Sequence, residues 1–269
     1  GTQTAALNVG EMDNYGIELS LNWKDKIGKD WKYKIGVNTG YSDNKVLNID
    51  WATEYIYRQM RRNERSDVGL WGLQCLGMFR SYQEIDEYFD RFGISSYLGM
   101  SKDQVKPGML IFKDVRGPQQ ADGTYAAPDG IVDKDNDQVQ ISTRSSNPWG
   151  FTTNFSVEWK SLSITGQISA SWGSYSTIPS AALKPGDGLD YTNMPSFWNP
   201  DDMYSYQDVR DASGNVVVKA NRDAKYPNLA YSSINATTST FWRISNTDVR
   251  LNRLTLAYSL PKGWVKKMG

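Results

Sequence analysis

The sequence predicts an all-β chain, and within that class a segment of an antiparallel transmembrane β-barrel with long extracellular loops. Three observations support this. Several stretches alternate apolar and polar residues with a period of two. Two pairs of these stretches are joined by short turns, whereas much longer segments separate the pairs. Short connections at one end of the strands and long ones at the other are typical of an outer-membrane barrel.

The first predicted hairpin lies near the start of the chain. From Tyr15 to Trp23, apolar residues alternate with small or polar ones. A charged, glycine-containing turn follows at residues 24–30, and alternation resumes from Trp31 to Ser42. The two stretches therefore predict antiparallel strands that each have one apolar face.

A second hairpin and a fifth strand repeat this pattern. Alternation runs from Phe151 to Trp159, crosses the tight turn at residues 160–161 and continues from Leu162 to Trp172. A fifth stretch, residues 248–260, shifts its phase by one residue near Asn252. Such a shift predicts a β-bulge, in which one strand carries an extra residue.

The long segments between the strands comprise about 100 residues (45–147) and about 70 (174–246), longer than connections in compact soluble domains. The first contains one predicted helix, Tyr82–Phe92. Ser81 and Glu84 form a capping-box pattern at its start, and Gly93 is suited to its end. Its apolar stripe, at helical spacing, is Ile85, Phe89 and Phe92.

The composition excludes several functions. Lys plus Arg and Asp plus Glu each total 30, so no net basic field attracts nucleic acid. The chain has no histidine and a single cysteine, Cys75, which excludes histidine-based catalytic triads and intrachain disulfides. No run of about 18 apolar residues predicts a membrane helix, and Gly1 to Val9 do not resemble a signal peptide.

Alternation alone also fits a soluble β-sandwich, in which one face of each strand is buried. The distribution of aromatic residues favours the barrel, because these residues gather at the short-turn ends of the strands, where a membrane interface favours amphipathic rings. They are Trp23, Trp31, Tyr33, Trp159, Tyr258 and Trp264. The opposite strand faces carry Ser, Thr, Asn, Gln and Lys, which suit a hydrated lumen.

Several segments, in order, resemble one family. Asn14–Trp23 resembles its "kG.E..l.w" strand, Gly77–Asp86 its "G.fqs.eeid" segment, and Lys106–Val115 its "kpGdikykDvngDG" segment. Further similar landmarks are Asp129–Asp133, Pro148–Phe151, Lys225–Leu229 and Leu251–Pro261. Together they cover nearly the whole chain, which thus resembles SusC/RagA-type TonB-dependent outer-membrane transporters.

The resemblance implies that residues 1–269 are a C-terminal portion of a 22-stranded barrel, without the plug domain, the early strands and the last strand. It implies TonB-dependent import of a glycan or oligosaccharide across the cell outer membrane, with a SusD-like surface lipoprotein. TonB would act through the missing N-terminal part, and outer-membrane lipid would surround the strands. Partners would thus be the lipoprotein, TonB, lipid and a glycan ligand.

Two alternatives remain open. A related transporter could take up a peptide, a siderophore or a cobalamin-like ligand, and a soluble glycan-binding β-domain would also fit the alternation. We do not expect an enzyme, because no carboxylate pair is singled out among the many acids.

Aromatic residues of the second long segment are candidates for stacking on sugar rings. The candidate sugar-binding residues are Trp198, Tyr204, Tyr206 and Trp242. The alternative is that these rings pack within the loop or against a partner.

Asp133, Asp135 and Asp137 occupy alternate positions, as the first ligands of a calcium loop do. However, Gln138 replaces the required glycine, and Arg144 stands where a glutamate should be. A structural calcium ion and a solvated acidic turn are therefore both open, and no other cofactor is expected.

A basic cluster, Arg58, Arg61, Arg62 and Arg65, has helical spacing. Glu64 and Asp67 dilute its charge. The cluster could bind an acidic ligand, but with this dilution a solvated face is the expected role.

Overall fold

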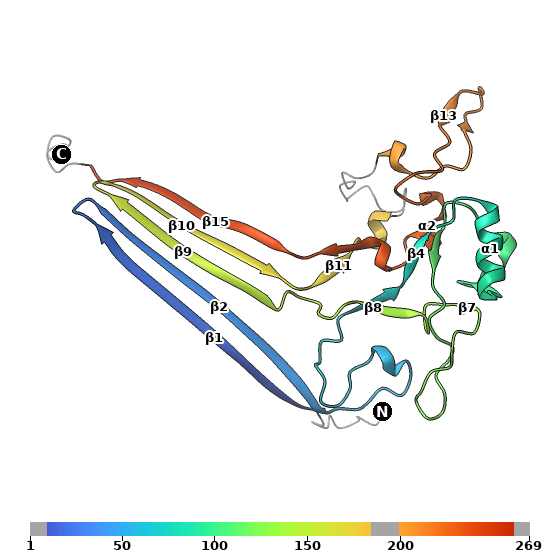
Figure 1. Ribbon diagram of the computed structural model, residues 1–269, viewed down its shortest axis with the longest axis horizontal. Helices are drawn as coiled ribbons and strands as arrows, with labels where there is room; N and C mark the ends of the chain where they lie inside the picture. Colours follow the sequence, from blue (N-terminus) through green and yellow to red (C-terminus); the bar gives the residue numbers. More distant parts are fainter. Residues whose placement is uncertain (1–9, 184–198, 261–269) are drawn as a thin grey trace, which may run out of the picture.

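The computed structural model describes residues 10–183 and 199–260, which form a long open sheet and a loop body at one end of it (Figure 1). The sheet has five antiparallel strands in the order β1-β2-β9-β10-β15. Their bounds are β1 Glu11–Ile27, β2 Trp31–Asn48, β9 Trp149–Trp159, β10 Leu162–Trp172 and β15 Asp248–Tyr258. The predicted all-β antiparallel class is confirmed, whereas closure into a barrel of 22 strands stays a prediction.

Both predicted hairpins are present. The first is longer than predicted, because cross-strand pairing continues through the charged residues to Ile27 and Trp31. Its turn is only residues 28–30, where Gly28 has a φ of 62°. The second hairpin turns at Lys160 and Ser161, as predicted, with Lys160 in the left-handed region at a φ of 52°.

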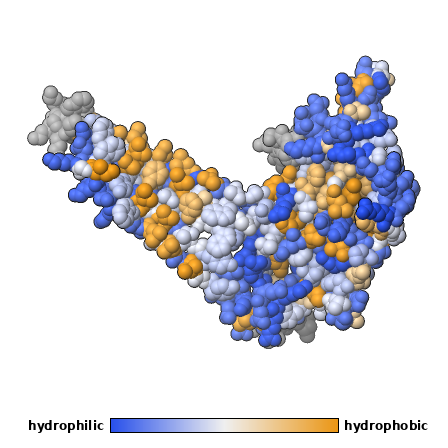
Figure 2. All heavy atoms as spheres, in the orientation of Figure 1, coloured by the Kyte–Doolittle hydropathy of each residue, from blue (hydrophilic) through white to orange (hydrophobic). Residues whose placement is uncertain are grey.

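The strand register gathers apolar residues on one face of the sheet. Ile35 lies between Trp23 and Phe155 in adjacent strands, and Ile164 lies between Val157 and Leu256. This face is open, with Ile17 72% and Leu256 68% exposed. Hydrophobic residues accordingly gather along the sheet in Figure 2, whereas the loop body is mainly hydrophilic in that view.

The predicted bulge in β15 is confirmed. Gln167 pairs with Arg253 and Ile168 with Leu251, so Asn252 is the extra residue. The Asn252 amide donates a hydrogen bond to Ser169 Oγ at 3.0 Å. The bulge restores the phase, so that Leu251 and Leu254 lie on the same apolar face.

The loop body is built from short elements contributed by both long segments. Its paired strands are β3 Leu70–Leu73 with β8 Gln138–Ser142, β4 Cys75–Met78 with β6 Leu110–Phe112, β5 Ser96–Tyr97 with β7 Ile131–Val132, β11 Tyr175–Thr177 with β14 Arg243–Ser245, and β12 Val209–Arg210 with β13 Val216–Val218. Its helices are α1 Tyr82–Phe92 and α2 Ser232–Asn235, and its 3-10 turns are Ile56–Arg58, Lys102–Gln104, Ser180–Leu183, Pro200–Asp202, Leu229–Tyr231 and Thr240–Trp242.

Helix α1 has the predicted bounds. Ser81 Oγ accepts from the Glu84 amide at 3.2 Å, and Gly93 ends the helix with a φ of 62°. Glu84 Oε2 accepts from the Arg80 amide at 2.7 Å, one residue before the position expected for a capping box.

The two long segments share one hydrophobic core. Ile85 and Phe89 of α1 are buried in the same cluster as Phe79, Tyr204 and Ile234. The expected stripe was wrong for Phe92, which is 52% exposed. Tyr88 is buried in its place, because its hydroxyl reaches the Phe112 carbonyl oxygen at 2.5 Å.

The basic cluster is not helical. Only Ile56–Arg58 form a 3-10 turn, and Asn63 has a φ of 65°, which an α-helix does not accommodate. Local hydrogen bonds to strand β2 override the helical spacing here, since Asn63 N donates to Val46 O at 2.8 Å.

In the described residues, no helix is long and apolar enough to cross a membrane.

Candidate functional site

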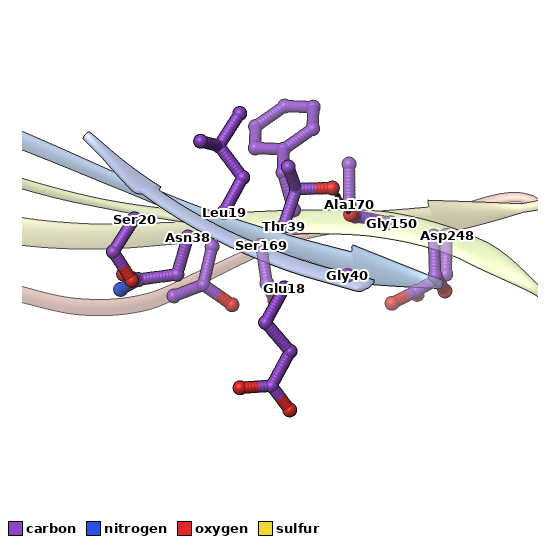
Figure 3. A pocket seen from close by; sticks show the side chains of 13 residues that line it. Glu18, Leu19, Ser20, Asn38, Thr39, Gly40, Gly150, Ser169, Ala170 and Asp248 are labelled. Carbon is purple, nitrogen blue, oxygen red and sulfur yellow. Dashed lines mark hydrogen bonds between the residues drawn. The ribbon is translucent and has the colours of Figure 1, made fainter. Parts of the chain in front are cut away.

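The polar face of the five-stranded sheet is the candidate site. Because side chains alternate along a strand, Leu19, Thr39 and Ala170 point to one side in Figure 3, and Glu18, Ser20 and Asn38 point to the other. A hollow of about 570 Å³ lies along the sheet here. The polar side chains that line it on this face are those of Glu18, Ser20, Asn38, Thr152, Ser169, Ser171 and Asp248.

Hydrogen bonds between neighbouring strands order this face. Ser20 Oγ donates to Asn38 Oδ1 at 2.8 Å, and the Gln167 amide donates to Asn154 Oδ1 at 2.9 Å. Within the described strands, the residues paired on this face include hydroxyl, amide and charged side chains but no aromatic ring. Such a surface holds polar ligands through hydrogen bonds and remains wettable.

Charge on the polar face is mixed. Near the loop body, Arg250 Nε lies 2.6 Å from Asp248 Oδ2, and near the short turns Lys32 Nζ lies 3.5 Å from Glu158 Oε2. These ion pairs are solvent-exposed and contribute little to stability. Glu18, Lys34, Asn154 and Gln167 also lie on this face, opposite the apolar residues.

Two of the four aromatic candidates lie in packed cores. Tyr204 and Trp242 are each 2% exposed. Tyr204 donates its hydroxyl to Arg80 O at 2.7 Å, and burial raises the pKa of Tyr204 to about 12. Trp242 Nε1 donates to Asn235 O at 2.6 Å.

The remaining two candidates differ. Tyr206 is half-buried, with its ring 5.4 Å from that of Tyr82 and the Arg222 guanidinium 4.1 Å above it. Trp198 lies outside the described residues. Tyr204 and Trp242 belong to separate hydrophobic clusters, so these two do not form one ligand-binding platform. Sugar stacking by the four residues stays a prediction.

The acidic turn uses its carboxylates internally. Asp137 Oδ1 accepts from the Val115 and Arg116 amides at 2.7 and 3.1 Å, and Asp137 Oδ2 accepts from the Asp133 amide at 2.8 Å. Asp133 Oδ1 accepts from the Asp135 amide at 2.7 Å, and Asp135 faces Arg58 at 3.6 Å.

This arrangement does not fit a calcium ion, because the oxygens that would coordinate it already accept from backbone amides or face a guanidinium group. Across residues 10–183 and 199–260, no group of three or more His, Cys, Asp or Glu side chains is placed to hold a metal. Calcium binding by Asp133, Asp135 and Asp137 stays a prediction that requires the turn to rearrange.

Asp114, a neighbouring carboxylate, was not among the site residues predicted from the sequence. Its Oδ2 accepts from the Gly130 amide at 2.7 Å, but its Oδ1 is buried without a hydrogen-bond partner. Burial, and then the charge of Asp129, raises its pKa above the ordinary value of 3.8. Burial also raises the pKa of Asp137, against the opposing effect of its amide hydrogen bonds.

A partly buried ion pair joins the loop body to the sheet. Arg144 Nη2 lies 2.8 Å from Asp43 Oδ2 on strand β2, and it also donates to the Tyr41 hydroxyl at 2.9 Å. The Tyr41 ring stacks on Trp149 with centroids 4.6 Å apart. These contacts fix the return of the first long segment at the end of the sheet that adjoins the loop body.

The sheet and loop body define a class: long antiparallel strands with opposed apolar and polar faces, continued at one end by an ordered loop domain. No family model matches the chain, and no curated protein matches it.

Solved structures do share the fold. One is "Structure of the RagAB peptide transporter", whose sequence is 14% identical to this chain. The superposition has a TM-score of 0.52 and covers 95% of this chain and 24% of the matched chain. The RagAB peptide importer in the "closed-closed" state is 16% identical with a TM-score of 0.56, covering 96% and 24%. In the "open-open" state it is 14% identical with a TM-score of 0.51, covering 95% and 23%. The chain thus spans about a quarter of the length of these chains, and at such identities the likeness shows the fold alone.

Proposed function

We propose that the chain is part of the barrel wall of a SusC/RagA-type TonB-dependent transporter that imports a nutrient across the outer membrane. The observation that carries the proposal is the five-stranded sheet, with an exposed apolar face and an opposite polar face free of aromatic rings in the described strands. The apolar face suits lipid, and the polar face suits a hydrated passage. Residues 1–269 would be the C-terminal portion of this barrel.

Partners follow from the same proposal. A SusD-like lipoprotein would dock on the loop-body side, because the loop body stands at the end of the sheet opposite the short turns (Figure 1). TonB would act through a plug that lies outside residues 1–269. The chain would therefore contribute the wall and outer loops of the import cavity rather than catalysis.

A glycan is the first candidate substrate, on the resemblance to SusC-type transporters and on the half-buried ring of Tyr206. A peptide is the second, and one observation favours it. The similar structures are named for a peptide transporter and importer. The polar face offers hydroxyl, amide and charged groups without rings, which suits a peptide backbone as well as a sugar.

Uptake by cells that express or lack the full transporter tests the function, with fluorescent oligosaccharides and oligopeptides offered separately. We expect transporter-dependent and TonB-dependent accumulation of one class. Accumulation that is equal in the two cell lines for both classes, or a protein that fractionates as a soluble monomer, would refute import by this chain.

A further inference from the structure

A cavity of about 460 Å³ lies outside the polar face, where the end of strand β2 meets the segment at residues 56–71. Tyr15 and Asp43, a directly paired couple, form part of its lining. They lie on the apolar face, two residue pairs beyond Ile17 and Tyr41. The cavity therefore opens beside the apolar surface of the sheet, at the edge next to the loop body.

Backbone hydrogen bonds build the outer wall of this cavity. Val46 N donates to Glu64 O at 2.9 Å, and Asn63 N donates to Val46 O at 2.8 Å. Asn44 Oδ1 accepts from the Ser66 amide at 2.8 Å. The segment is thereby held against β2, and the cavity is a feature of the folded backbone.

Three cations line the cavity: Lys45, Arg61 and Arg65. In the part of the chain that the structure describes, none of them has an ion-pair partner within 4.0 Å. Arg61 donates to Ile56 O at 3.2 Å and Arg65 to Thr143 O at 3.1 Å. These bonds orient the guanidinium groups and use one of the five donors that each carries.

The carboxylates around the cavity cancel these charges only in part. Asp43 is bound by Arg144, and Asp67 accepts from the Gly69 and Ser145 amides at 2.9 Å each. Burial acts to raise the pKa of Asp67, but these amide bonds and the charge of Arg144 hold the pKa below its ordinary value. Among the lining residues, Glu64 and Asp67 then stand against three cations, which leaves an excess of one positive charge.

Aromatic rings supply the rest of the lining. Tyr57 and Trp71 pack edge to face with centroids 5.5 Å apart, and Tyr15 is exposed beside them. Guanidinium groups recognise phosphate through paired hydrogen bonds, and flat rings pack on sugar faces. The combination suits a phosphorylated sugar.

We propose that this cavity binds the phosphorylated sugar headgroup of an outer-leaflet glycolipid whose acyl chains lie on the adjacent apolar face. The inference rests on the proposed outer-membrane function. A soluble phosphate-bearing ligand would use the same cations, but it would gain nothing from the neighbouring apolar surface.

The test uses the full transporter, purified in detergent, and diphosphoryl lipid A as the probe. Lys45→Gln, Arg61→Gln and Arg65→Gln are combined in one variant. Arg62→Gln, Lys113→Gln and Lys219→Gln form the control, which removes the same charge at exposed positions outside the cavity. We expect binding to weaken by about tenfold or more in the first variant only, the loss equivalent to one or more charge-assisted contacts.

Two further measurements distinguish a lipid ligand from a soluble phosphate-bearing ligand. Monophosphoryl lipid A should bind more weakly than the diphosphoryl form, and inorganic phosphate at equal concentration should not displace either. Displacement by inorganic phosphate would overturn the lipid assignment. Since Arg65 holds the Thr143 carbonyl, Lys45→Gln alone provides a second variant that leaves this bond intact and should also weaken binding.

The two proposals fail in distinguishable ways. Equal lipid binding by all variants, with the protein in the outer-membrane fraction, would refute the glycolipid site and leave the import function standing. A protein absent from the outer-membrane fraction would refute both.

Discussion

Single residues show where the packing is uneven. Asp114 is a carboxylate with one buried, unpartnered oxygen, and Gly166 is a residue whose missing side chain makes room for a ring. Neither role is visible in the sequence pattern, because both depend on neighbours distant in the chain. Each leads to a measurable effect of a small substitution.

Asp114→Asn should stabilise the loop body by about 1 kcal/mol at neutral pH, the order of a burial cost removed from an unsatisfied charged group. The raised pKa means that the folded state holds this proton more tightly than the unfolded chain. The associated stability is present below about pH 3.8 and is lost as the pH rises through the raised pKa. Unfolding midpoints in detergent from pH 3 to 7 test this. A variant with the same pH dependence as the parent, or a less stable one at neutral pH, would contradict the assignment.

Gly166→Ala should destabilise the sheet by roughly 1–3 kcal/mol, as overpacking does. A Cβ at this position would lie 2.3 Å from Cζ of Phe155, which packs across the glycine from strand β9. The double variant with Phe155→Val removes the clash, so its free energy of unfolding should fall by less than the sum of the falls in the two single variants. If thermal unfolding shows that the two losses simply add, the ring of Phe155 moves aside without cost.

Whole elements were more predictable than their contacts. Alternation located all five long strands, and the phase shift located the bulge at Asn252, because strand faces follow from a period of two. Capping chemistry located α1, since Ser81 and Gly93 act within one turn of the helix ends. The sequence did not predict the burial of Tyr204 and Trp242, which depends on two long segments that meet only in three dimensions.

At this scale, α1 provides a matched pair of substitutions. Phe89→Asp should severely lower the amount of folded protein, because Phe89 is 4% exposed in the shared core and an unpaired buried charge costs several kcal/mol. Phe92→Asp, on the same helix at 52% exposure, should be tolerated. Outer-membrane abundance and lipoprotein capture measure the two effects. Normal abundance but lost capture for Phe89→Asp would instead place this stripe at the partner interface.

The loop body and the sheet differ in how much of their apolar surface is buried. The loop body has a continuous core from both long segments, whereas the described sheet is open and exposes a face of apolar residues. Strands β1 and β15 each have one neighbour in the described sheet, so one edge of each is free to pair with further strands. Such a sheet gains stability when further strands pair with its edges and another apolar surface covers its exposed face.

The proposed role as a membrane wall predicts which face of the sheet meets lipid and which meets water. Single cysteines in a Cys75→Ser background, labelled with an environment-sensitive fluorophore, would compare apolar positions with their polar neighbours in proteoliposomes. Labels at Ile17, Ile35, Phe155 and Ile168 should be quenched by brominated lipid, because the register places all four on one exposed face. Labels at Glu18, Lys34, Asn154 and Gln167 should instead be quenched by a water-soluble agent.

The period-two alternation is the discriminating result, because a soluble sandwich would bury the apolar positions against a second sheet. In that case the labels at the apolar positions would be shielded from both quenchers, and brominated lipid would have no effect on any of the eight labels. A loss of alternation between Ile17 and Glu18 alone would point to local fraying at an edge strand. A loss of alternation between Phe155 and Asn154, in the centre of the sheet, would remove the physical basis for treating this sheet as a membrane wall.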